Sequence, residues 1–332
     1  MSDTAILVEG LAKRFGDVVA LDGIDFQVPA GSVFGLLGPN GAGKTTAIRI
    51  LTTILRPDGG RAEVLGLDVV RQADEVRYRI GLAGQYAAID PNLTGRENLR
   101  LTGRLAQLPT ADARTRADEL LERFQLSDAG DRPARTYSGG MRRRLDVAAA
   151  LVQRPPVVFL DEPTTGLDLQ SRNALWEMIR ELVAEGTTVL LTTQYLEEAD
   201  RLAQRIAVVD GGKVIADDTP AALKAQLGST VIELGMGDPA RAARAEDLVA
   251  RMAASPERDG ATLRLTSDDG SRLLIDVLRL LDDQDLAPTT LAVRDPSMDD
   301  VFLALTGHRA EAEAAGNGDR PGRGGARSRG AG

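Results

Sequence analysis

The sequence predicts an α/β fold built around a mostly parallel β-sheet. Three short and almost wholly apolar runs, at 32–40, 157–163 and 187–193, have the composition of central strands that are buried on both faces. A helical segment follows each of these runs, which is the alternation typical of α/β proteins. Alternating apolar and polar residues at 6–28 and 62–69 predict an antiparallel sheet beside the parallel one.

A helical insertion interrupts this core. Residues 96–128 carry two helical patterns on either side of Pro109 and no strand pattern. We therefore expect these helices to form a separate part of the first unit, in a helical region that extends over about 90–150.

The chain divides into three parts by pattern. The first unit spans 4–227, and a new β-α-β-α-β-α order then predicts a small C-terminal α/β domain at 228–307. Residues 308–332 are rich in Gly, Ala and Arg without apolar periodicity, which is typical of a disordered tail.

Composition excludes several classes of protein. The net charge of -9 argues against general binding to nucleic acid. Apolar runs such as 147–152 are far shorter than the roughly 18 residues that a membrane-spanning helix needs. The first ten residues include two acids and no basic residue, so we expect no secretory signal. Because the chain has no cysteine, disulfides and cysteine metal sites are excluded.

Residues 38–46, GPNGAGKTT, match the phosphate-loop pattern (Walker A) between a predicted strand and a predicted helix. Glycines let the backbone approach a phosphate closely and point its N–H groups inward. The pattern predicts that Lys44 reaches the β- and γ-phosphates of a nucleotide and that the Thr45 hydroxyl ligates Mg²⁺. The residues expected to bind the nucleotide here are Gly38, Pro39, Asn40, Gly41, Ala42, Gly43, Lys44, Thr45 and Thr46.

Two acids follow the apolar run VVFL, as a metal-dependent nucleotide site requires. We expect Asp161, at the end of this strand, to hold Mg²⁺ (Walker B). Glu162, the next residue, is placed to polarise the attacking water as a general base.

Ser138, Gly139 and Gly140 precede a long helical pattern and would form a second anion-binding helix start. Together with GPNGAGKTT and FLDEPTTGLD, the stretch YSGGMRRRLD resembles the ATP-binding subunits of ABC transporters over residues 4 to about 227. The motifs GQYAAID, LLTTQYLEEAD and DDVFLALTGH extend the resemblance to the daunorubicin/doxorubicin-resistance type, as far as about His308.

The resemblance implies an ABC cassette with a RecA-like core sheet, and it implies roles for further residues. Gln85 matches the glutamine that senses Mg²⁺ and water, and Asp168 matches an acid that crosses between subunits. Phe15 matches an aromatic residue that stacks on adenine. The signature residues are Tyr137, Ser138, Gly139, Gly140 and Met141, where Met141 replaces a commoner glutamine.

Gln194 stands where most members of this family have a histidine that contacts the γ-phosphate. The only histidine of the chain is His308. A glutamine amide donates a hydrogen bond but neither becomes cationic nor transfers a proton. The resemblance therefore implies that Gln194 contacts the γ-phosphate, and the open alternative is a polar residue that fills the turn.

The resemblance also implies partners and a function. Two cassettes face each other in this family, so we expect a homodimer in which the signature of one chain completes the site of the other. The chain would hydrolyse ATP at the cytoplasmic face of the membrane, as a peripheral subunit that powers a separate integral membrane permease. The expected process is export of a hydrophobic drug or antibiotic.

Other readings of the chain stay open. A soluble ATPase of the same family that acts on ribosomes or DNA is one alternative, and a regulatory clamp that binds ATP with little turnover is another. Tyr86, Ala87, Ala88, Ile89 and Leu93 either contact the permease or pack against the helical insertion. For the domain at 228–307, dimer stabilisation, permease docking and regulation all fit.

Overall fold

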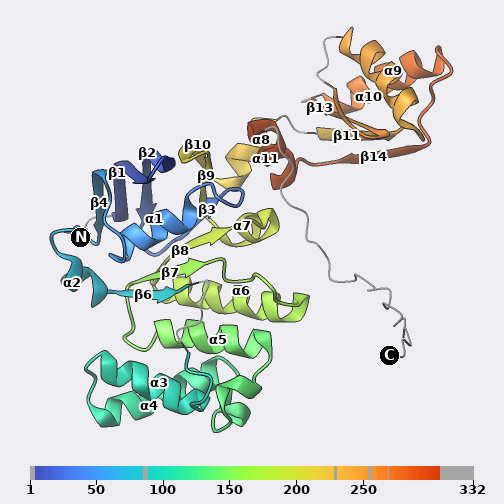
Figure 1. Cartoon of the computed structure of the whole chain (residues 1–332). Helices are drawn as coiled ribbons and strands as arrows, with labels where there is room; N and C mark the ends of the chain where they lie inside the picture. Colours follow the sequence, from blue (N-terminus) through green and yellow to red (C-terminus); the bar gives the residue numbers. More distant parts are fainter. Residues whose placement is uncertain (1–3, 85–88, 228–229, 253–255, 268, 307–332) are drawn as a thin grey trace, which may run out of the picture.

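The computed structural model of the chain describes residues 4–84, 89–227, 230–252, 256–267 and 269–306. Figure 1 shows a layered cassette, with the helices α3 and α4 at one end and the C-terminal sheet at the other. The α/β architecture predicted from the sequence is confirmed.

A six-stranded sheet forms the centre of the cassette, in the order β10-β9-β3-β8-β7-β6. All of its neighbouring strands pair in parallel except β9 and β10, which form an antiparallel hairpin. The strands are β3 (Val33–Leu37), β6 (Ile80–Ala83), β7 (Val157–Asp161), β8 (Thr188–Thr193), β9 (Arg205–Asp210) and β10 (Lys213–Asp218).

The central strands are apolar throughout because both of their faces are covered. In β7, Val158 and Leu160 belong to the apolar core on one face of the sheet, while Val157 and Phe159 belong to the core on the other. Successive side chains of a strand point to opposite faces, so a sheet between two cores requires an unbroken apolar run. This is why the sequence pattern identified these strands.

A second sheet covers one face of the central sheet. It is antiparallel, in the order β2-β1-β4-β5, and its side chains share a core with helix α1. These elements are β1 (Thr4–Phe15), β2 (Val18–Pro29), α1 (Lys44–Leu51), β4 (Gly59–Val64), β5 (Leu67–Asp68) and α2 (Ala73–Arg77).

Helices cover the opposite face, and the predicted insertion is among them. Thr94 and Glu97 form a capping box at the start of α3, which fixes where that helix begins. Pro109 caps α4, so the two helices flank it as predicted. The helices are α3 (Gly95–Leu105), α4 (Thr110–Arg123), α5 (Gly139–Ala150), α6 (Leu169–Ala184), α7 (Leu196–Leu202) and α8 (Pro220–Ala225), with 3₁₀ turns at Ser127–Ala129 and Ala134–Thr136.

The C-terminal part forms a third, antiparallel sheet in the order β12-β13-β11-β14. Helices α9 and α10 pack on it around Ile232, Leu234, Val249 and Val277. The elements are β11 (Thr230–Gly235), α9 (Pro239–Ala250), β12 (Glu257–Asp259), β13 (Thr262–Ser267), α10 (Gly270–Asp282), β14 (Thr290–Arg294) and α11 (Met298–Thr306). The order matches the predicted pattern apart from the short strand β12.

The last helix does not pack on this sheet. Met298, Val301 and Phe302 of α11 are buried in the same apolar core as Leu196 of α7 and Leu223 of α8. Figure 1 shows α11 beside α8, at the base of the C-terminal sheet. The predicted domain limits at 227 and 307 stay predictions, and the sequence did not indicate that α11 returns to the cassette.

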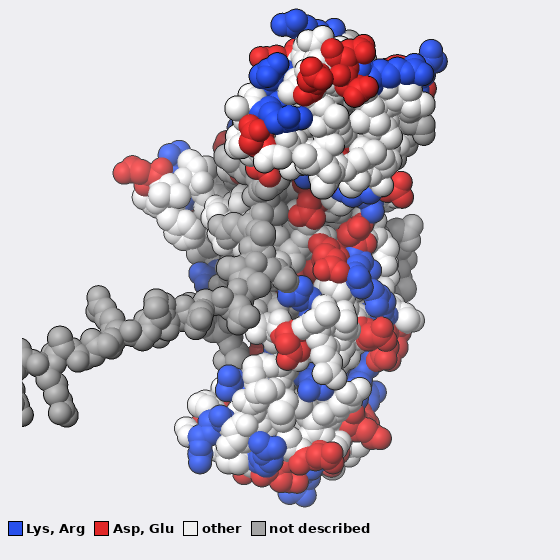
Figure 2. Space-filling model, turned by 90° about the vertical axis from the view of Figure 1, so that its right-hand side faces the viewer, with Lys and Arg blue, Asp and Glu red and all other residues white. Residues whose placement is uncertain are grey.

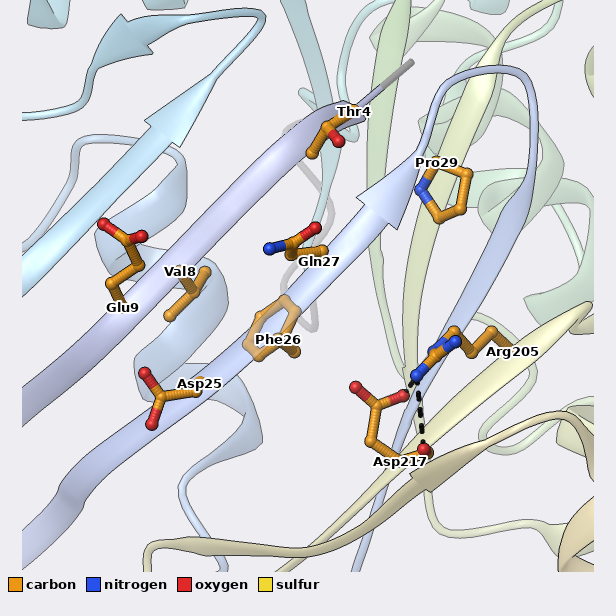
Figure 3. Close-up of a pocket in the computed structure, with 9 residues that line it drawn as sticks. All are labelled: Thr4, Val8, Glu9, Asp25, Phe26, Gln27, Pro29, Arg205 and Asp217. Atoms are coloured by element: carbon orange, nitrogen blue, oxygen red, sulfur yellow. Dashed lines mark hydrogen bonds and ion pairs between the residues drawn. The ribbon is translucent and has the colours of Figure 1, made fainter. Parts of the chain in front are cut away.

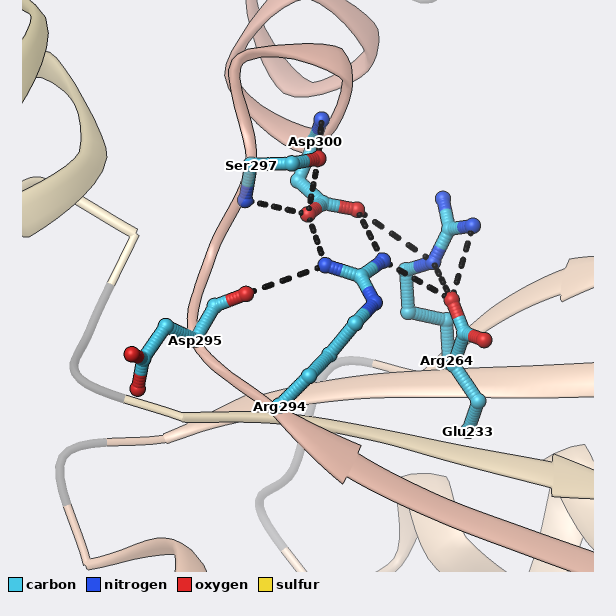
Figure 4. Close-up of polar contacts among 6 residues, drawn as sticks. All are labelled: Glu233, Arg264, Arg294, Asp295, Ser297 and Asp300. Carbon is cyan, nitrogen blue, oxygen red and sulfur yellow. Dashed lines mark hydrogen bonds and ion pairs between the residues drawn. The ribbon is translucent and has the colours of Figure 1, made fainter.

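A network of ion pairs joins α11 to the C-terminal sheet (Figure 4). Arg294, the last residue of β14, donates to both carboxylate oxygens of Asp300 at 2.6 and 2.9 Å and to Glu233 of β11 at 2.9 Å. Ser297 donates to Asp300 through its backbone N–H and its hydroxyl. Burial acts to raise the pKa of Asp300, but the bonds from Arg294 and Ser297 outweigh it and lower the pKa to about 2.

No helix in the described ranges is both long enough and apolar enough to cross a membrane.

Asp300→Asn is predicted to destabilise the fold by about 2 kcal/mol at neutral pH, because each unit of pKa shift corresponds to about 1.4 kcal/mol. The pKa is lowered in the fold, so the carboxylate stabilises above about pH 4, and this contribution is lost as the pH falls toward 2. Urea unfolding measures the free energy of unfolding of both proteins across this range. The exposed Asp276→Asn is the control. A difference between wild type and Asp300→Asn that does not shrink with falling pH would contradict the assignment.

Candidate nucleotide-binding site

The phosphate loop connects β3, an interior strand of the six-stranded sheet, to helix α1. A side chain at Gly38 would place its Cβ 2.2 Å from the backbone oxygen of Val209 on β9. Gly43 has φ +110°, and a Cβ there would lie 2.4 Å from the backbone oxygen of Ala20. Both positions therefore require glycine. At Gly38 the reason is the close neighbouring strand, and at Gly43 it is both a close backbone oxygen and the left-handed conformation.

Lys44 and Thr45 follow directly, at the start of α1. The Lys44 side chain is buried, and its Nζ donates to the backbone oxygens of Gly38 at 2.6 Å and Pro39 at 3.0 Å. These bonds hold the ammonium group inside the curve of the loop. The loop thus encloses a positive charge at the amino end of a helix, the arrangement that favours an anion.

Asp161 lies within reach of α1, although 116 residues separate it from Thr45. The Thr45 hydroxyl donates to Asp161 Oδ1 at 3.2 Å, and the hydroxyl of Thr192 donates to the same oxygen at 2.6 Å. Thr192 belongs to β8, the strand between β7 and β3. The parallel strand order therefore brings the two predicted metal ligands, Thr45 and Asp161, together.

Glu162 has a left-handed backbone with φ +48°, which is uncommon for a residue other than glycine. Its N–H donates to the backbone oxygen and to the hydroxyl of Thr192, both at 3.1 Å. Glu162 lines a hollow of about 190 Å³ together with residues 40–46 of the phosphate loop and with Val18 and Ala20 of β2. The predicted base and the predicted phosphate loop thus border the same cavity.

Phe15 lies at the end of β1, paired across the hairpin with Val18. Its ring is 48% exposed, and Lys13 Nζ lies 5.6 Å from the ring centre. Because Val18 lines the cavity, its partner Phe15 lies beside the cavity with a partly exposed ring. This position suits a stacking residue, as the sequence predicts.

The predicted signature residues gather elsewhere, around the starts of α5 and α6. Ser138 caps α5 by accepting from the N–H of Met141 at 3.2 Å, and Asp168 caps α6 by accepting from the N–H of Ser171 at 2.7 Å. This second bond is the main cause that lowers the pKa of Asp168. A Cβ at Gly140 would lie 2.4 Å from Ser171 Oγ, so the two helix starts touch.

Tyr137 was predicted to bind nucleotide, but its side chain is buried within the helical region of its own chain. It is buried in the core, and its hydroxyl donates to the backbone oxygen of Ala129 at 2.7 Å. The ring and hydroxyl of Tyr137 therefore hold the helical region together, and none of residues 137–141 lines the cavity beside the phosphate loop.

Gln194 follows the end of β8, as predicted, and is half-buried. Its Oε1 atom is buried and has no hydrogen-bond partner among the residues that the structure describes. Gln85, predicted to sense Mg²⁺, lies outside the described residues, as do Tyr86, Ala87 and Ala88. Ile89 is described: it is half-buried and packs against the helical core, so a permease contact at this position stays open.

Another hollow, of about 600 Å³, lies between the antiparallel sheet and strands β9 and β10 (Figure 3). Its lining includes Glu9 and Asp25, and Arg205, the one basic residue among the described lining, is paired with Asp217 at 2.6 Å. An anionic nucleotide would meet acids and a neutralised arginine there. Size alone therefore does not identify the nucleotide site, and the smaller cavity has the matching chemistry.

The donor set at Asp161 fits Mg²⁺. In the described part of the chain, no group of three or more His, Cys, Asp or Glu is arranged to hold a metal. Mg²⁺ bound with a nucleotide needs few protein ligands, because phosphate oxygens and waters supply the others. One carboxylate and one hydroxyl, on Asp161 and Thr45, match that requirement.

Comparison with known proteins places the chain. A family model described as ABC transporter matches residues 21–165. A daunorubicin resistance ATP-binding protein of Streptomyces coeruleorubidus is 56% identical over 314 residues, which cover 94% of this chain and 98% of that protein. The chain belongs to the ABC transporter family. It is an ATP-binding subunit of that family with ATPase activity, as the sequence motifs predicted.

Further relatives and structures agree with this placement of the cassette. A Nod factor export ATP-binding protein of Ralstonia nicotianae is 42% identical, over 92% of this chain and 95% of that protein. A solved structure from Clostridium perfringens, described as part of an ABC transporter complex, has a TM-score of 0.63 and 28% identity, and covers 68% of this chain and 92% of that chain. The predicted cassette fold is confirmed.

Thr192 and Arg143 are two residues of the site that the sequence reasoning missed. Thr192 was assigned only to a buried strand, and a threonine within an apolar strand gives no signal of the two bonds that it forms. Arg143 donates to the backbone oxygens of Asp161 and Pro163, on either side of Glu162, but it is one of three consecutive arginines at 142–144 that sequence alone does not distinguish. The basic run was visible, but the partner of each arginine depends on the fold.

Thr192→Val is predicted to lower ATP turnover about tenfold, because it keeps the side-chain volume and removes the hydroxyl that joins Asp161 to the N–H of Glu162. Steady-state ATP hydrolysis and the melting temperature are the measurements. Thr192→Ser keeps the hydroxyl and is the matched control, with turnover near that of the wild type. Normal turnover in Thr192→Val would show that this hydroxyl does not position the acids.

Proposed function

We propose that the chain is the ATP-hydrolysing subunit of a drug-export ABC transporter and that it binds ATP with Mg²⁺ at the cavity beside the phosphate loop. Lys44 and the N–H groups of residues 40–46 hold the phosphates, and Phe15 stacks on the adenine ring. Thr45 and Asp161, with Gln85, hold Mg²⁺, which neutralises charge on the phosphates when bound. The contact between Thr45 and Asp161 supports this assignment.

Glu162 is the proposed general base. It follows β7 and borders the same cavity as the phosphate loop, and its carboxylate accepts a hydrogen bond from the Thr165 hydroxyl at 3.3 Å. A carboxylate in this position takes the proton of a water that attacks the γ-phosphate. Gln194 contacts the γ-phosphate as a neutral residue by donating from its Nε2, because phosphate oxygens only accept. Its buried Oε1, which has no partner among the described residues, is an acceptor and does not carry that contact.

The proposed active species is a homodimer. Ser138, Gly139, Gly140 and Met141 with Asp168 form a second group of nucleotide-binding residues that does not border the chain's own phosphate loop. Gly139 has open space where a side chain would be, so another molecule has access to the start of α5. Two chains that face each other place this group of each chain against the phosphate loop of the other.

We further propose that a separate integral membrane permease is the partner and that the chain is peripheral at the cytoplasmic face of the membrane. The relative with 56% identity is named for daunorubicin resistance, and another with 42% identity is named for Nod factor export. One name states drug resistance and the other states export, and the similarity extends over more than nine tenths of this chain. That similarity is the observation that carries the export proposal.

The surface charge does not favour a nucleic-acid partner. On the face in Figure 2, acidic and basic side chains are interspersed over the cassette and the C-terminal unit. The net charge of -9 points the same way. A clamp with little turnover is disfavoured by the placement of Glu162 at the cavity.

Glu162→Gln is predicted to bind ATP, to lower turnover by about 100-fold or more and to accumulate as a closed dimer, because the amide accepts no proton. ATP hydrolysis, ATP affinity and size-exclusion chromatography of the full-length chain are the measurements. Lys44→Ala, which loses ATP binding, is the control for occupancy.

Cells that carry the chain with its permease should lose drug export in both variants. Unchanged turnover in Glu162→Gln would remove the assignment of the base, and recovery of the wild type with ribosomes instead of membranes would remove the export proposal.

Gln194→Ala is predicted to lower turnover about tenfold while ATP affinity changes less than twofold, because the contact to the γ-phosphate strengthens in the transition state. The rate in the wild type should show no histidine-like step between about pH 6 and 7 from this position. Hydrolysis rates from pH 5.5 to 8.5 test both statements. Wild-type turnover in Gln194→Ala would show that Gln194 only fills the turn after β8 and does not contact the γ-phosphate.

A further inference from the structure

Arg143, two residues after the signature residues 137–141, forms several hydrogen bonds to the backbone around the nucleotide site. It lies on α5, and its guanidinium donates to the backbone oxygens of Asp161 at 2.9 Å, Pro163 at 2.8 Å and Gly84 at 2.6 Å. A fourth bond, at 3.2 Å, goes to the carboxylate of Asp146. One side chain of the signature helix thus joins the carboxyl ends of β7 and β6.

Two of these backbone oxygens belong to the residues on either side of Glu162. Nη2 holds the carbonyl that precedes Glu162, and Nε holds the carbonyl of the residue that follows it. The guanidinium therefore bridges the short turn that carries the proposed base. The planar guanidinium uses two different nitrogen atoms for these two bonds and so fixes the separation of the carbonyls, whereas an ammonium group donates from a single atom on a flexible stem.

The turn needs such support because Glu162 has a left-handed backbone. A residue with a Cβ adopts this conformation when its surroundings determine it. The N–H of Glu162 is bonded to Thr192, and its carbonyl accepts from the N–H of Thr165 at 3.4 Å. Arg143 supplies the remaining two bonds, on the flanking carbonyls.

The charge of Arg143 is balanced inside the protein. Its side chain is 12% exposed, and that of Asp146 is 2% exposed. Burial lowers the pKa of Arg143, while the nearby carboxylates of Asp146, Asp161 and Glu198 oppose this shift. Asp146 is the direct partner, so the arginine and the aspartate form a buried pair placed beneath the site.

We propose that Arg143 is a positioning residue for ATP hydrolysis, which holds the carboxylate of Glu162 at the cavity by bonding to both flanking carbonyls. The inference rests on the proposed function, in which Glu162 is the base. Arg143 lies one helical turn after Gly139, so it also fixes the base of one site to the helix whose start faces the partner's nucleotide.

Arg143→Gln is expected to lower the turnover number of the full-length chain by about 10- to 100-fold, with the ATP dissociation constant within about twofold of the wild type. Arg143→Lys keeps the charge without the planar group and is expected to show a smaller loss in the same direction. Arg116→Gln is the matched control, since Arg116 is 16% exposed, pairs with Glu119 three residues on and donates to one backbone oxygen, away from the site. Its turnover is expected to change less than twofold.

A double variant separates positioning from general stability. In the Glu162→Gln background, Arg143→Gln should add no further loss in single-turnover hydrolysis, because the base that it positions is gone. Wild-type turnover in Arg143→Gln, or a full additional loss in the double variant, would overturn the proposal. If the melting temperature shows that Arg143→Gln does not fold, Arg143→Lys replaces it in both the single and the double variant.

The outcomes for the two proposals are distinguishable. Loss of turnover in Glu162→Gln with normal turnover in Arg143→Gln removes only the positioning role. Normal turnover in Glu162→Gln removes the base and the positioning role together.

Discussion

The turn at the end of β7 is the point on which the site depends. Asp161 and Glu162 are adjacent in sequence, yet Asp161 faces α1 and Glu162 borders the cavity in a left-handed conformation. That conformation costs about 1–2 kcal/mol for a residue with a Cβ. Each hydrogen bond contributes about 0.5–1.5 kcal/mol, so the bonds from Thr192, Thr165 and Arg143 outweigh the cost.

The same turn explains how elements far apart in sequence act together. Thr192 reaches it from β8, Thr45 from α1 and Arg143 from α5. The parallel order of β6, β7, β8 and β3 places the carboxyl ends of these strands along one edge of the sheet. Helix α5, which begins with the signature glycines, is therefore bonded directly to the backbone around Glu162 in its own chain.

The C-terminal unit is connected to the cassette through α11. Met298, Val301 and Phe302 pack with Leu196 of α7, the helix that follows Gln194, while Asp300 is held by Arg294 of the C-terminal sheet. The apolar contacts and the ion pairs lie on the same short helix. The C-terminal sheet is therefore tied to the part of the cassette beside β8 by both apolar and charged contacts.

Sequence alone determined the central strands, the phosphate loop, the acids at 161 and 162 and the helical insertion. These features follow from local pattern, because burial on both faces requires apolar runs and phosphate binding requires glycines at fixed spacing. The fold decided which of three consecutive arginines bonds to the turn around Glu162, that Thr192 joins the two acids, that the side chain of Tyr137 is buried within the protein and that α11 returns to the cassette. Each of these is a contact between residues that lie apart along the chain, so it depends on how strands and helices are placed in space, and a pattern of neighbouring residues carries no record of it.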